Sequence, residues 1–556
     1  MSMKKRVAAL IMQALETLKS QALLDILETP SFQVDVPKLA EHGDFATNAA
    51  LLLAKSVRRA PRRVAELIRD NLNPPPGMLA RVEIAGPGFI NFFLEGTYWL
   101  QVLDDIASAG GTYGQSTMGA GKSVQVEFVS ANPTGPLHVG HGRGAALGDA
   151  LANILSATGH RVEREYYIND IGLQMQTLGL SLLLRVKELQ GEPVSFPENC
   201  YQGDYIKVLA RQYLEQHGPI SLEEPDAAAL EAGGRYAGEA ILAGIRQDLA
   251  DFGVHFDHWF SETRLFQDHD LDHAFAALQE RGYLYEADGA LWFKATAFGD
   301  EKDRVVRRQN GATTYFASDI GYHWQKFQRG FHQVIDIWGA DHHGYVPRLK
   351  AVVQALGIPA ERLTILLVQL VSLLREGEPV AMTTRGGTFV TLREVMDEVG
   401  KDAARFIFLS RRADAHLEFD LELAKQQSNE NPVYYVQYAH ARLASVFRLA
   451  QEKGLAGEAD QSANLTRLTL PEEITLLKLL ATYPEVVEAA AFHLEPHRIT
   501  YFLTELAGQL HGYYYRHRFI SDDADLSRAR LRLVRGIKTI LAHGLGLLGV
   551  EAPENM

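Results

Sequence analysis

A strand pattern, a glycine-rich turn and a helix pattern follow one another between residues 123 and 159, and this order constrains the fold more than any other feature. Val124, Val126 and Phe128 alternate with polar residues as a strand does, and residues 147–155 follow helical spacing until Gly159. The turn between them therefore lies at a helix N-terminus, where free backbone N–H groups and the helix dipole favour an anion. Glycine allows close approach of the backbone to such an anion at positions 135, 140, 142 and 144.

Two histidines, His138 and His141, lie in this turn. Taken alone, a His-x-x-His pair is more often a pair of ordinary polar turn residues. At a glycine-rich helix start, the two imidazoles can instead donate hydrogen bonds to phosphate oxygens. The context favours this second interpretation, so the segment predicts a phosphate site.

The residues around the pair resemble a known family. Ser130-Ala131-Asn132-Pro133 precedes His138-Val139-Gly140-His141, which is similar to the HIGH signature of class I aminoacyl-tRNA synthetases, and the surroundings resemble arginyl-tRNA synthetases. Three further segments are similar to signatures of that family, in the family's order: residues 256–262, 338–344 and 431–442. The resemblance spans nearly the whole chain. It implies ATP-dependent activation of L-arginine to arginyl-adenylate and transfer to the 3′ end of its cognate tRNA, with release of AMP and pyrophosphate.

The pattern of elements predicts an α/β plus all-α fold. Residues 1–112 carry helical periodicity and then strand-like stretches, which indicates a small α+β domain. Residues 122–400 alternate strands and helices as a Rossmann-type parallel sheet requires, with an expected insertion at about 172–305. Residues 425–556 are helical almost throughout and predict a helical bundle. The resemblance implies that the three regions are an additional tRNA-binding domain, the class I catalytic domain and the anticodon-binding domain.

Composition limits the remaining classes. The chain has 556 residues, 46% of them hydrophobic, but no apolar stretch reaches the roughly 18 residues that cross a bilayer. The first six residues lead into an amphipathic helix, so we expect a cytoplasmic protein without a membrane partner. Cys200 is the only cysteine, which excludes intramolecular disulfides and Cys-rich zinc sites. Because members of the resembled family are usually monomers, we expect this chain to be a monomer.

The net charge of −14 argues on average against nucleic acid, because cations must neutralise the phosphates. Two basic clusters lie in the terminal regions that the resemblance assigns to tRNA binding. Each cluster is equally compatible with a solvated helix face. Their members are Arg58, Arg59, Arg62 and Arg63, and then Arg516, Arg518, Arg528, Arg530, Arg532 and Arg535.

Two motifs resemble sites that we reject. Residues 119–123 resemble the end of a phosphate-binding P-loop, but Ser116 occupies the position of the first glycine. In addition, the segment comes before a strand, whereas a P-loop comes directly after one. His269 and His273 have metal-ligand spacing on a helix, yet no convergent ligands support a metal, and an acidic helix start is favoured. We therefore predict no protein-held metal, and expect Mg²⁺ to enter on the phosphates of ATP.

The resemblance also implies a set of site residues. The expected donors to phosphate are His138 and His141, with Arg385 as a further catalytic cation. The expected ATP-binding residues are His138, Gly140, His141, Gly339, Asp341, His342 and Met382. Asp319 and Tyr315 are expected to hold the guanidinium of arginine, with Glu127 and Asn132 at its ammonium and carboxylate end. Asn48, Tyr435, Tyr438 and Arg442 are expected to bind tRNA. Ordinary roles remain open, namely a surface ion pair for Asp319 and helix-bundle core for the tyrosines.

One stretch departs from the family. Class I enzymes usually carry a KMSKS loop whose lysine steadies the pyrophosphate, and residues 381–392 lack its lysines. Thr134 and Gly135 occupy the stretch where some relatives place a compensating lysine, so Arg385 is the first candidate cation and Arg375 the second. The degenerate loop leaves one alternative of a different class, a synthetase-like protein that binds or regulates tRNA without activating arginine. A smaller HxGH-type nucleotidyltransferase is disfavoured by the long helical C-terminal region.

Overall fold

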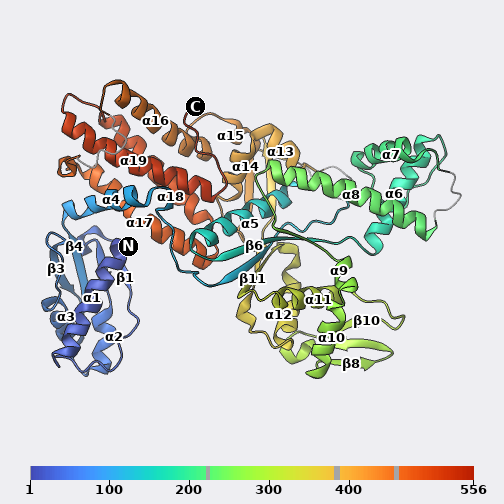
Figure 1. Cartoon of the computed structure of the whole chain (residues 1–556), viewed down its shortest axis with the longest axis horizontal. Coiled ribbons are helices and arrows are strands. Elements are labelled where there is room, and N and C mark those ends of the chain that lie inside the picture. The colour runs from blue at the N-terminus through green and yellow to red at the C-terminus, as the bar shows by residue number, and fades with distance from the viewer. Residues whose placement is uncertain (1, 221–225, 381–388, 456–462) are drawn as a thin grey trace.

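A five-stranded parallel sheet forms the centre of the molecule (Figure 1). The computed structural model describes residues 2–220, 226–380, 389–455 and 463–556. The sheet has the order β12-β11-β5-β6-β7, and every neighbouring pair is parallel. Its strands are β5 (Ser123–Glu127), β6 (Arg161–Ile168), β7 (His258–Ser261), β11 (Gln333–Gly339) and β12 (Leu363–Val368). The predicted Rossmann-type sheet is confirmed.

Crossover helices connect the strands, as parallel pairing requires. Helix α5 (Val139–Ala157) joins β5 to β6, α11 (Tyr315–Gln328) precedes β11, and α12 (Val346–Ala355) joins β11 to β12. The predicted helical stretch up to Gly159 and the buried strand ending at Gly339 are both present. Because β5 and β11 are adjacent and parallel, the turn after β5 and the segment after Gly339 lie at the same edge of the sheet.

The predicted single insertion at 172–305 is wrong in one respect. β7 lies inside that range and pairs with β6, so the sheet divides the range into two excursions. The first is an arm of helices α6 (Leu173–Leu189), α7 (Asp204–His217) and α8 (Ala227–Asp251), which projects at the right of Figure 1. The second contains α9 (Thr263–Gln267), α10 (Asp270–Glu280) and the antiparallel strands β8 (Leu284–Ala287), β9 (Ala290–Phe293) and β10 (Arg304–Arg307). A strand of four residues is too short for its periodicity to identify it in the sequence.

The N-terminal region is the α+β unit that was predicted. Its four strands have the order β1-β2-β4-β3 and are antiparallel. The strands are β1 (Val34–Asp35), β2 (Phe45–Thr47), β3 (Leu79–Ala85) and β4 (Phe89–Leu94), and the helices are α1 (Met3–Ser20), α2 (Ala49–Ser56) and α3 (Pro61–Asp70). Helix α4 (Gln101–Ala109) then leads to the sheet.

The C-terminal region is a helical bundle, as expected. Its long helices are α16 (Pro432–Glu452), α17 (Pro471–His493), α18 (His497–Arg516) and α19 (Ala524–Leu547). A connecting unit precedes them, with β13 (Val371–Arg375), β14 (Glu378–Pro379), β15 (Leu417–Asp420), α13 (Leu392–Val399), α14 (Lys401–Phe408) and α15 (Leu421–Lys425). Lys478 of α17 pairs with Asp44, so the bundle contacts the N-terminal unit directly. Among the helices of the described residues, none has the length and apolar character needed to cross a bilayer.

Candidate active site

His138 and His141 together cap the N-terminus of α5. His138 Nδ1 accepts hydrogen bonds from the backbone N–H groups of Gly140 at 3.1 Å and His141 at 3.3 Å. His141 Nδ1 accepts in return from the backbone N–H of His138 at 3.3 Å, and the two rings stack with centroids 3.7 Å apart. Because each Nδ1 is an acceptor, the neutral ring carries its proton on Nε2. The network therefore assigns each imidazole one remaining donor, Nε2–H, at the positive end of a helix.

Burial keeps both imidazoles neutral at physiological pH. It lowers the pKa of His138, with partial compensation from its own backbone hydrogen bond and from the nearby charge of Asp341. Burial, followed by repulsion from His138, lowers the pKa of His141 to about 3. The charge of Asp341 thus acts on His138.

The segment after residue 388 lies against this turn. Val139 N donates to Val390 O at 3.3 Å, Leu392 N donates to Leu137 O at 2.8 Å, and the Phe389 ring meets His138 edge-on at 6.2 Å. Met382 and Arg385 lie outside the described residues. Arg375, the second candidate cation, makes two 2.8 Å hydrogen bonds to Glu398, so its guanidinium is already engaged.

A cavity of about 370 Å³ opens at the edge of the sheet where β5 and β11 end. It brings together all four residues expected to bind arginine, Glu127, Asn132, Tyr315 and Asp319, and also Gly339 and His342 of the expected ATP set. Tyr315 and Asp319 lie one turn apart on α11, as their spacing predicts. Asp319 accepts a hydrogen bond from the Tyr345 hydroxyl and lines the cavity, so the surface ion pair is not its role.

A strained turn carries the chain from β5 into this cavity. Val129 and Ser130 have φ values of 67° and 39°, in the left-handed region that a β-branched residue such as valine rarely adopts. The Ser130 hydroxyl donates to Glu127 Oε1 at 2.9 Å and accepts from Tyr167 N at 3.1 Å. These two bonds hold the turn, so that Ser130 and Asn132 line the same cavity as Glu127.

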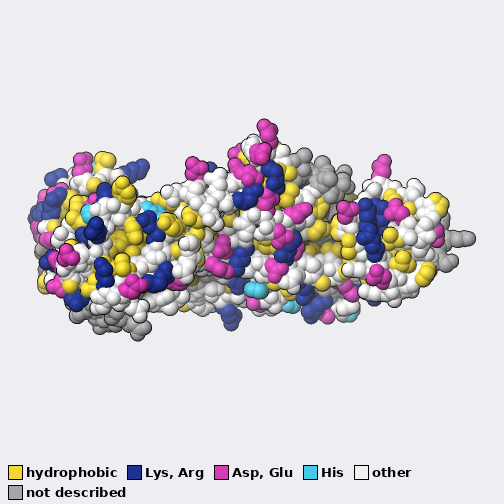
Figure 2. Space-filling view, turned by 90° about the horizontal axis from the view of Figure 1, so that it is seen from above, with side chains coloured by type: hydrophobic (Ala, Val, Ile, Leu, Met, Phe, Trp, Pro, Cys, Tyr) yellow, Lys and Arg dark blue, Asp and Glu magenta, His cyan; other side chains and the backbone are white. Residues whose placement is uncertain are grey.

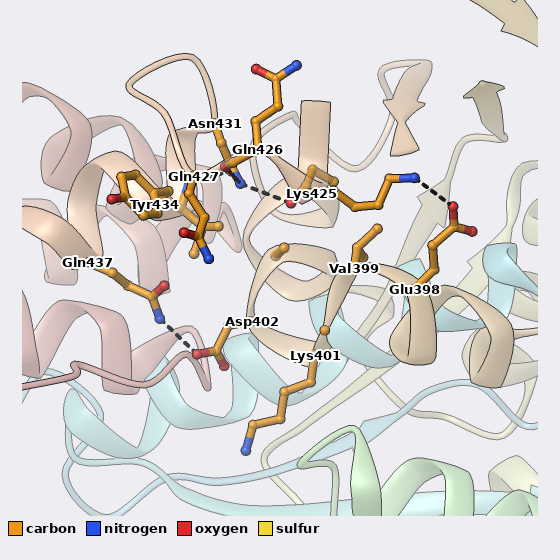
Figure 3. Close-up of a pocket in the computed structure, with 14 residues that line it drawn as sticks. Glu398, Val399, Lys401, Asp402, Lys425, Gln426, Gln427, Asn431, Tyr434 and Gln437 are labelled. Carbon is orange, nitrogen blue, oxygen red and sulfur yellow. Dashed lines mark hydrogen bonds and ion pairs between the residues drawn. The ribbon is translucent and has the colours of Figure 1, made fainter. Parts of the chain in front are cut away.

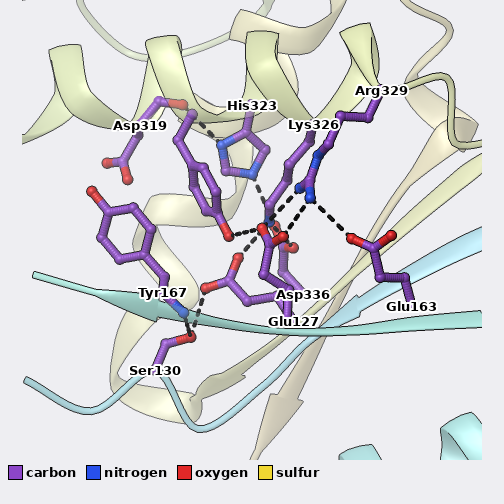
Figure 4. A network of polar contacts seen from close by, with 11 residues as sticks. Glu127, Ser130, Glu163, Tyr167, Asp319, His323, Lys326, Arg329 and Asp336 are labelled. Atoms are coloured by element: carbon purple, nitrogen blue, oxygen red, sulfur yellow. Dashed lines mark hydrogen bonds and ion pairs between the residues drawn. The ribbon is translucent and has the colours of Figure 1, made fainter. Parts of the chain in front are cut away.

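A network of buried charges lies beneath the cavity (Figure 4). Lys326 of α11 is fully buried and pairs with Glu127 and, at 2.7 Å, with Asp336 of β11. His323 Nε2 lies 2.9 Å from the other oxygen of Asp336. Burial alone lowers the pKa of Lys326, but Asp336 and Glu127 outweigh it and raise that pKa. Lys326 is therefore a permanent internal cation.

Carboxylates outnumber cations around the cavity. Burial raises the pKa of Glu127 even though Lys326 opposes it, and burial likewise raises the pKa of Asp319 and of Glu262. A raised carboxylate pKa means that the surroundings compensate the negative charge incompletely. Arg329, the other cation in Figure 4, is engaged by Glu163 and Glu165. The cavity thus has the charge that suits a cationic ligand.

The residues expected to bind tRNA on α16 form one cluster with α18. Tyr435 and Tyr438 face His511, with ring centroids 4.6 and 6.0 Å away. The Arg442 guanidinium lies 3.8 Å from the centroid of the Tyr514 ring. All of these side chains are half-buried, so each pairs with a bundle neighbour and also keeps an open surface. Asn48, by contrast, lies in the N-terminal unit, where its Oδ1 accepts from Gln33 N at 3.1 Å.

A second cavity, of about 480 Å³, lies where α13, α14 and α15 meet the start of α16 (Figure 3). Its polar groups are largely paired with one another. Gln437 donates to Asp402 at 2.8 Å, and Asn431 Nδ2 donates at 2.9 Å to the carbonyls of both Ala424 and Gln426. Asn431 also caps α16. The contacts indicate that this site fixes the start of α16 and so the orientation of the aromatic cluster.

Sequence reasoning missed three residues of the site, Lys326, Asp336 and Tyr345. Lys326 had a detectable signal, because Tyr315, Asp319, His323 and Lys326 repeat at spacings of four, four and three on one helical face. Asp336 is a charged residue inside an otherwise apolar strand pattern, which is a second signal. Tyr345 lies in a short 3₁₀ segment whose direction the sequence does not reveal. The C-terminal basic cluster also contains an arginine that does not face solvent, because Arg530 is buried and paired with Glu473.

Comparison with known proteins covers the chain from end to end. Residues 5–94 match the model of the arginyl tRNA synthetase N-terminal domain, residues 103–443 the class I (R) tRNA synthetase catalytic domain, and residues 436–556 the DALR anticodon-binding domain. The arginine–tRNA ligases of Citrifermentans bemidjiense and Syntrophotalea carbinolica are 56% and 55% identical, over the whole of both chains. A crystal structure from Campylobacter jejuni, described as an arginyl t-RNA synthetase, has a TM-score of 0.76 and 36% identity, covering 83% of this chain and 100% of that one. The Thermus thermophilus arginyl-tRNA synthetase structure shares the fold, with a TM-score of 0.75 at 23% identity over 100% of each chain.

Proposed function

The chain belongs to the arginyl-tRNA synthetase family, and on this premise we propose how its site attaches L-arginine to its cognate tRNA. The carboxylate of arginine attacks the α-phosphate of ATP and expels pyrophosphate, which gives arginyl-adenylate. A ribose hydroxyl at the tRNA 3′ end then attacks the carbonyl carbon, and AMP leaves. By family resemblance the first attack uses the 2′-hydroxyl.

The observation that carries the proposal is the position of two neutral imidazole donors at a helix N-terminus, at the same sheet edge as a carboxylate-rich cavity. Neither step needs a protein nucleophile, so catalysis rests on positioning and on preorganised donors. We assign the Nε2–H groups of His138 and His141 to phosphate oxygens. One such donor is worth about 2.7–4 kcal/mol of transition-state stabilisation when it is well aimed.

Arginine is held by its charge and its shape. A planar guanidinium with five donors requires carboxylate and hydroxyl acceptors, which Asp319 and Tyr315 supply at the cavity. Glu127 already pairs with Lys326 and Ser130, so we assign it, with Asn132, to orient the ammonium and carboxylate end through its remaining lone pairs. The carboxylate excess favours arginine over neutral analogues of the same shape.

Three finer assignments belong to the same proposal. Among the described residues no group of His, Cys, Asp and Glu can hold a metal alone, so Mg²⁺ would be held mainly by the ATP phosphates. Arg385 takes over the role of the absent KMSKS lysine, which is supported by the contact between Phe389, four residues later, and His138. A cytoplasmic monomer is the state we expect from the family.

Charging of cognate tRNA with arginine, citrulline and lysine tests the proposal. Citrulline keeps nearly the shape of arginine but lacks the positive charge, so its kcat/KM should be lower by more than about a hundredfold. Equal use of citrulline would contradict the acidic pocket.

ATP–pyrophosphate exchange with arginine, with and without tRNA, separates an active enzyme from a protein that only binds tRNA. Arg385→Ala should impair the exchange, and unchanged exchange in that variant, with His141→Ala inactive, would exclude Arg385.

A further inference from the structure

A series of buried contacts runs beneath the arginine cavity and joins two of its walls (Figure 4). Glu127 of β5 pairs with Lys326 of α11, and Lys326 Nζ lies 2.7 Å from Asp336 Oδ1. The other oxygen of Asp336 lies 2.9 Å from His323 Nε2, and His323 Nδ1 lies 2.9 Å from the backbone carbonyl oxygen of Asp319. The series therefore begins and ends at acidic residues that line the cavity. We call these five residues the buried link.

Regular backbone positions every member of the buried link. Glu127 and Asp336 are paired residues of the adjacent parallel strands β5 and β11, so their side chains leave the sheet on the same face. Asp319, His323 and Lys326 follow one another at spacings of four and three residues, which places them on one face of α11. The buried link thus ties one helix face to two strands, and it spans the floor of the cavity from one acidic end to the other.

Burial makes the buried link rigid. The side chains of Lys326 and Asp336 have no exposed surface, and His323 is 2% exposed. Burial opposes the ionisation of Asp336, yet Lys326 and then His323 outweigh it and lower its pKa. On the face that Figure 2 shows, by contrast, charged side chains of both signs are interspersed at the surface, where water and salt screen them. A buried charge cannot exchange its partner for water at low cost, so these contacts persist when a ligand binds.

His323 holds the turn of α11 that carries Asp319. The carboxylate of Asp319 accepts a hydrogen bond from the Tyr345 hydroxyl, whereas its backbone carbonyl faces His323. A carbonyl and a carboxylate are both acceptors, and an imidazole with a proton on each nitrogen donates to both. Lys326 ties a later part of the helix to the sheet. His323 therefore sets how the Asp319 turn stands relative to β11.

We propose that the buried link fixes the distance between the two acidic ends of the cavity, and that His323 is the positioning residue that makes the site select the length of the amino-acid side chain. The inference rests on the proposed function, in which Asp319 holds the guanidinium and Glu127 orients the ammonium end. Arginine then satisfies both ends at once, whereas an analogue that is one methylene longer or shorter satisfies one end at the expense of the other. In a fitted site, one methylene changes discrimination by about 10- to 200-fold.

Two analogues of arginine test the proposal, homoarginine with one methylene more and norarginine with one methylene less. Calorimetric titration of the full chain gives the ratio of each analogue's Kd to that of arginine, and the wild-type ratios should be about 10 to 200. His323→Phe keeps a buried ring but removes both hydrogen bonds, so it should lower both ratios by about 2- to 30-fold. His323→Gln keeps a donor and should retain more of each ratio. His440→Phe is the matched control, since it removes a buried imidazole that bonds to Pro553 O in the bundle, and both ratios should stay unchanged.

A second variant acts from behind the cavity. Asp336 lies outside the described lining, so Asp336→Asn weakens the buried link without changing a cavity wall. It should lower both ratios in the same direction as His323→Phe. Asp336→Asn and His323→Gln also keep the test decisive if His323→Phe does not fold, because their ratios must then fall below those of the wild type.

The ratios distinguish positioning from general damage, because a distorted cavity weakens arginine and both analogues alike. Wild-type ratios retained in His323→Phe and Asp336→Asn overturn the inference, and so does a wild-type chain that binds either analogue as tightly as arginine. The proposed function fails by a different result, namely a wild-type chain that binds none of the three amino acids, and the inference falls with it. Tight binding of arginine with unchanged ratios in the variants refutes the role of the buried link alone.

Discussion

At the scale of single residues, the negative charge of the cavity depends on the small number of cations that pair with its buried carboxylates. Lys326 alone pairs with both Glu127 and Asp336, and its side chain has no exposed surface. A buried ion pair stabilises a fold weakly as a whole, but the loss of one partner leaves an uncompensated charge. Lys326 is thus needed to keep Glu127 ionised at the cavity while the cavity stays acidic enough for arginine.

Lys326→Met should lower the free energy of unfolding by about 3–5 kcal/mol, because two buried carboxylates lose their cation. The measurement is urea unfolding followed by circular dichroism. Lys425→Met is the matched control, since Lys425 pairs with Glu398 and Glu422 at the exposed surface, and its urea midpoint should not change. Equal midpoints for the two variants would show that Lys326 is not the counter-charge.

His141 should make the fold less stable in acid. Its pKa is about 3 in the folded chain, against 6.5 in the unfolded chain. As the pH falls between these values, the unfolded chain binds a proton that the folded chain does not, so stability decreases. His141→Asn removes this proton, and its free energy of unfolding should fall by about 2 kcal/mol less than that of the wild type between pH 6.5 and 4.5. Parallel stability curves for the two proteins would refute the assignment.

At the scale of elements, α5 is positioned by glycines that let it lie close to the sheet. A Cβ atom on Gly148 would lie 2.1 Å from the Phe128 ring, which is itself fully buried and packs against Phe256 at 4.4 Å. The end of β5 therefore sets how deeply α5 lies. Since His138 caps this same helix, the depth of α5 also determines where the imidazole donors stand relative to the cavity.

Gly148→Ala should therefore lower the free energy of unfolding by about 1–3 kcal/mol through overpacking. It should also reduce pyrophosphate exchange, because α5 must shift. Gly144→Ala offers a control one turn away, where an added Cβ meets no atom within 4 Å. That change should leave stability unchanged or raise it by up to about 1 kcal/mol, since alanine favours helix. Thermal unfolding of both variants decides, and a destabilised Gly144→Ala with an unaffected Gly148→Ala would contradict the packing argument.

The same elements show what the sequence reveals and what it conceals. Helix α11 and strand β11 were predictable, because Tyr315 and Asp319 keep helical spacing and residues 334–338 are apolar except for Asp336 before Gly339. β7 was missed because its four residues become a strand only by pairing with β6, which lies far away in the sequence. The left-handed conformations of Val129 and Ser130 were equally invisible, since neither residue favours them and only the surrounding contacts impose them.

At the scale of the whole molecule, one buried arginine joins regions that are distant in the sequence. Arg405 of α14 pairs with Asp149 of α5 at 2.6 Å, and donates to Leu548 O after α19 at 2.9 Å and to Phe252 O after α8 at 3.1 Å. A Cβ on Gly549 would lie 2.1 Å from this guanidinium, so the turn after α19 closes tightly around it. Arg405 thereby fixes the helical bundle and the arm to the helix that carries the histidine pair.

Arg405→Met should loosen this junction without altering the arginine cavity, which is built by β5, α11 and the end of β11. The variant leaves Asp149 with the longer contacts to Arg164 at 3.4 Å and to Asn153 at 3.3 Å, and it removes the donors to two buried carbonyls. Stability should therefore fall by about 3–5 kcal/mol. The bundle then holds tRNA less rigidly relative to α5, and the KM for tRNA should rise.

Arginine affinity, measured by calorimetry without tRNA, should stay within about twofold, since the junction does not touch the cavity. Arg412→Met, which removes an exposed pair with Asp414, should change neither quantity. A loss of arginine affinity equal to the loss for tRNA would mean that Arg405 supports the sheet edge itself, and not the junction between the bundle and α5.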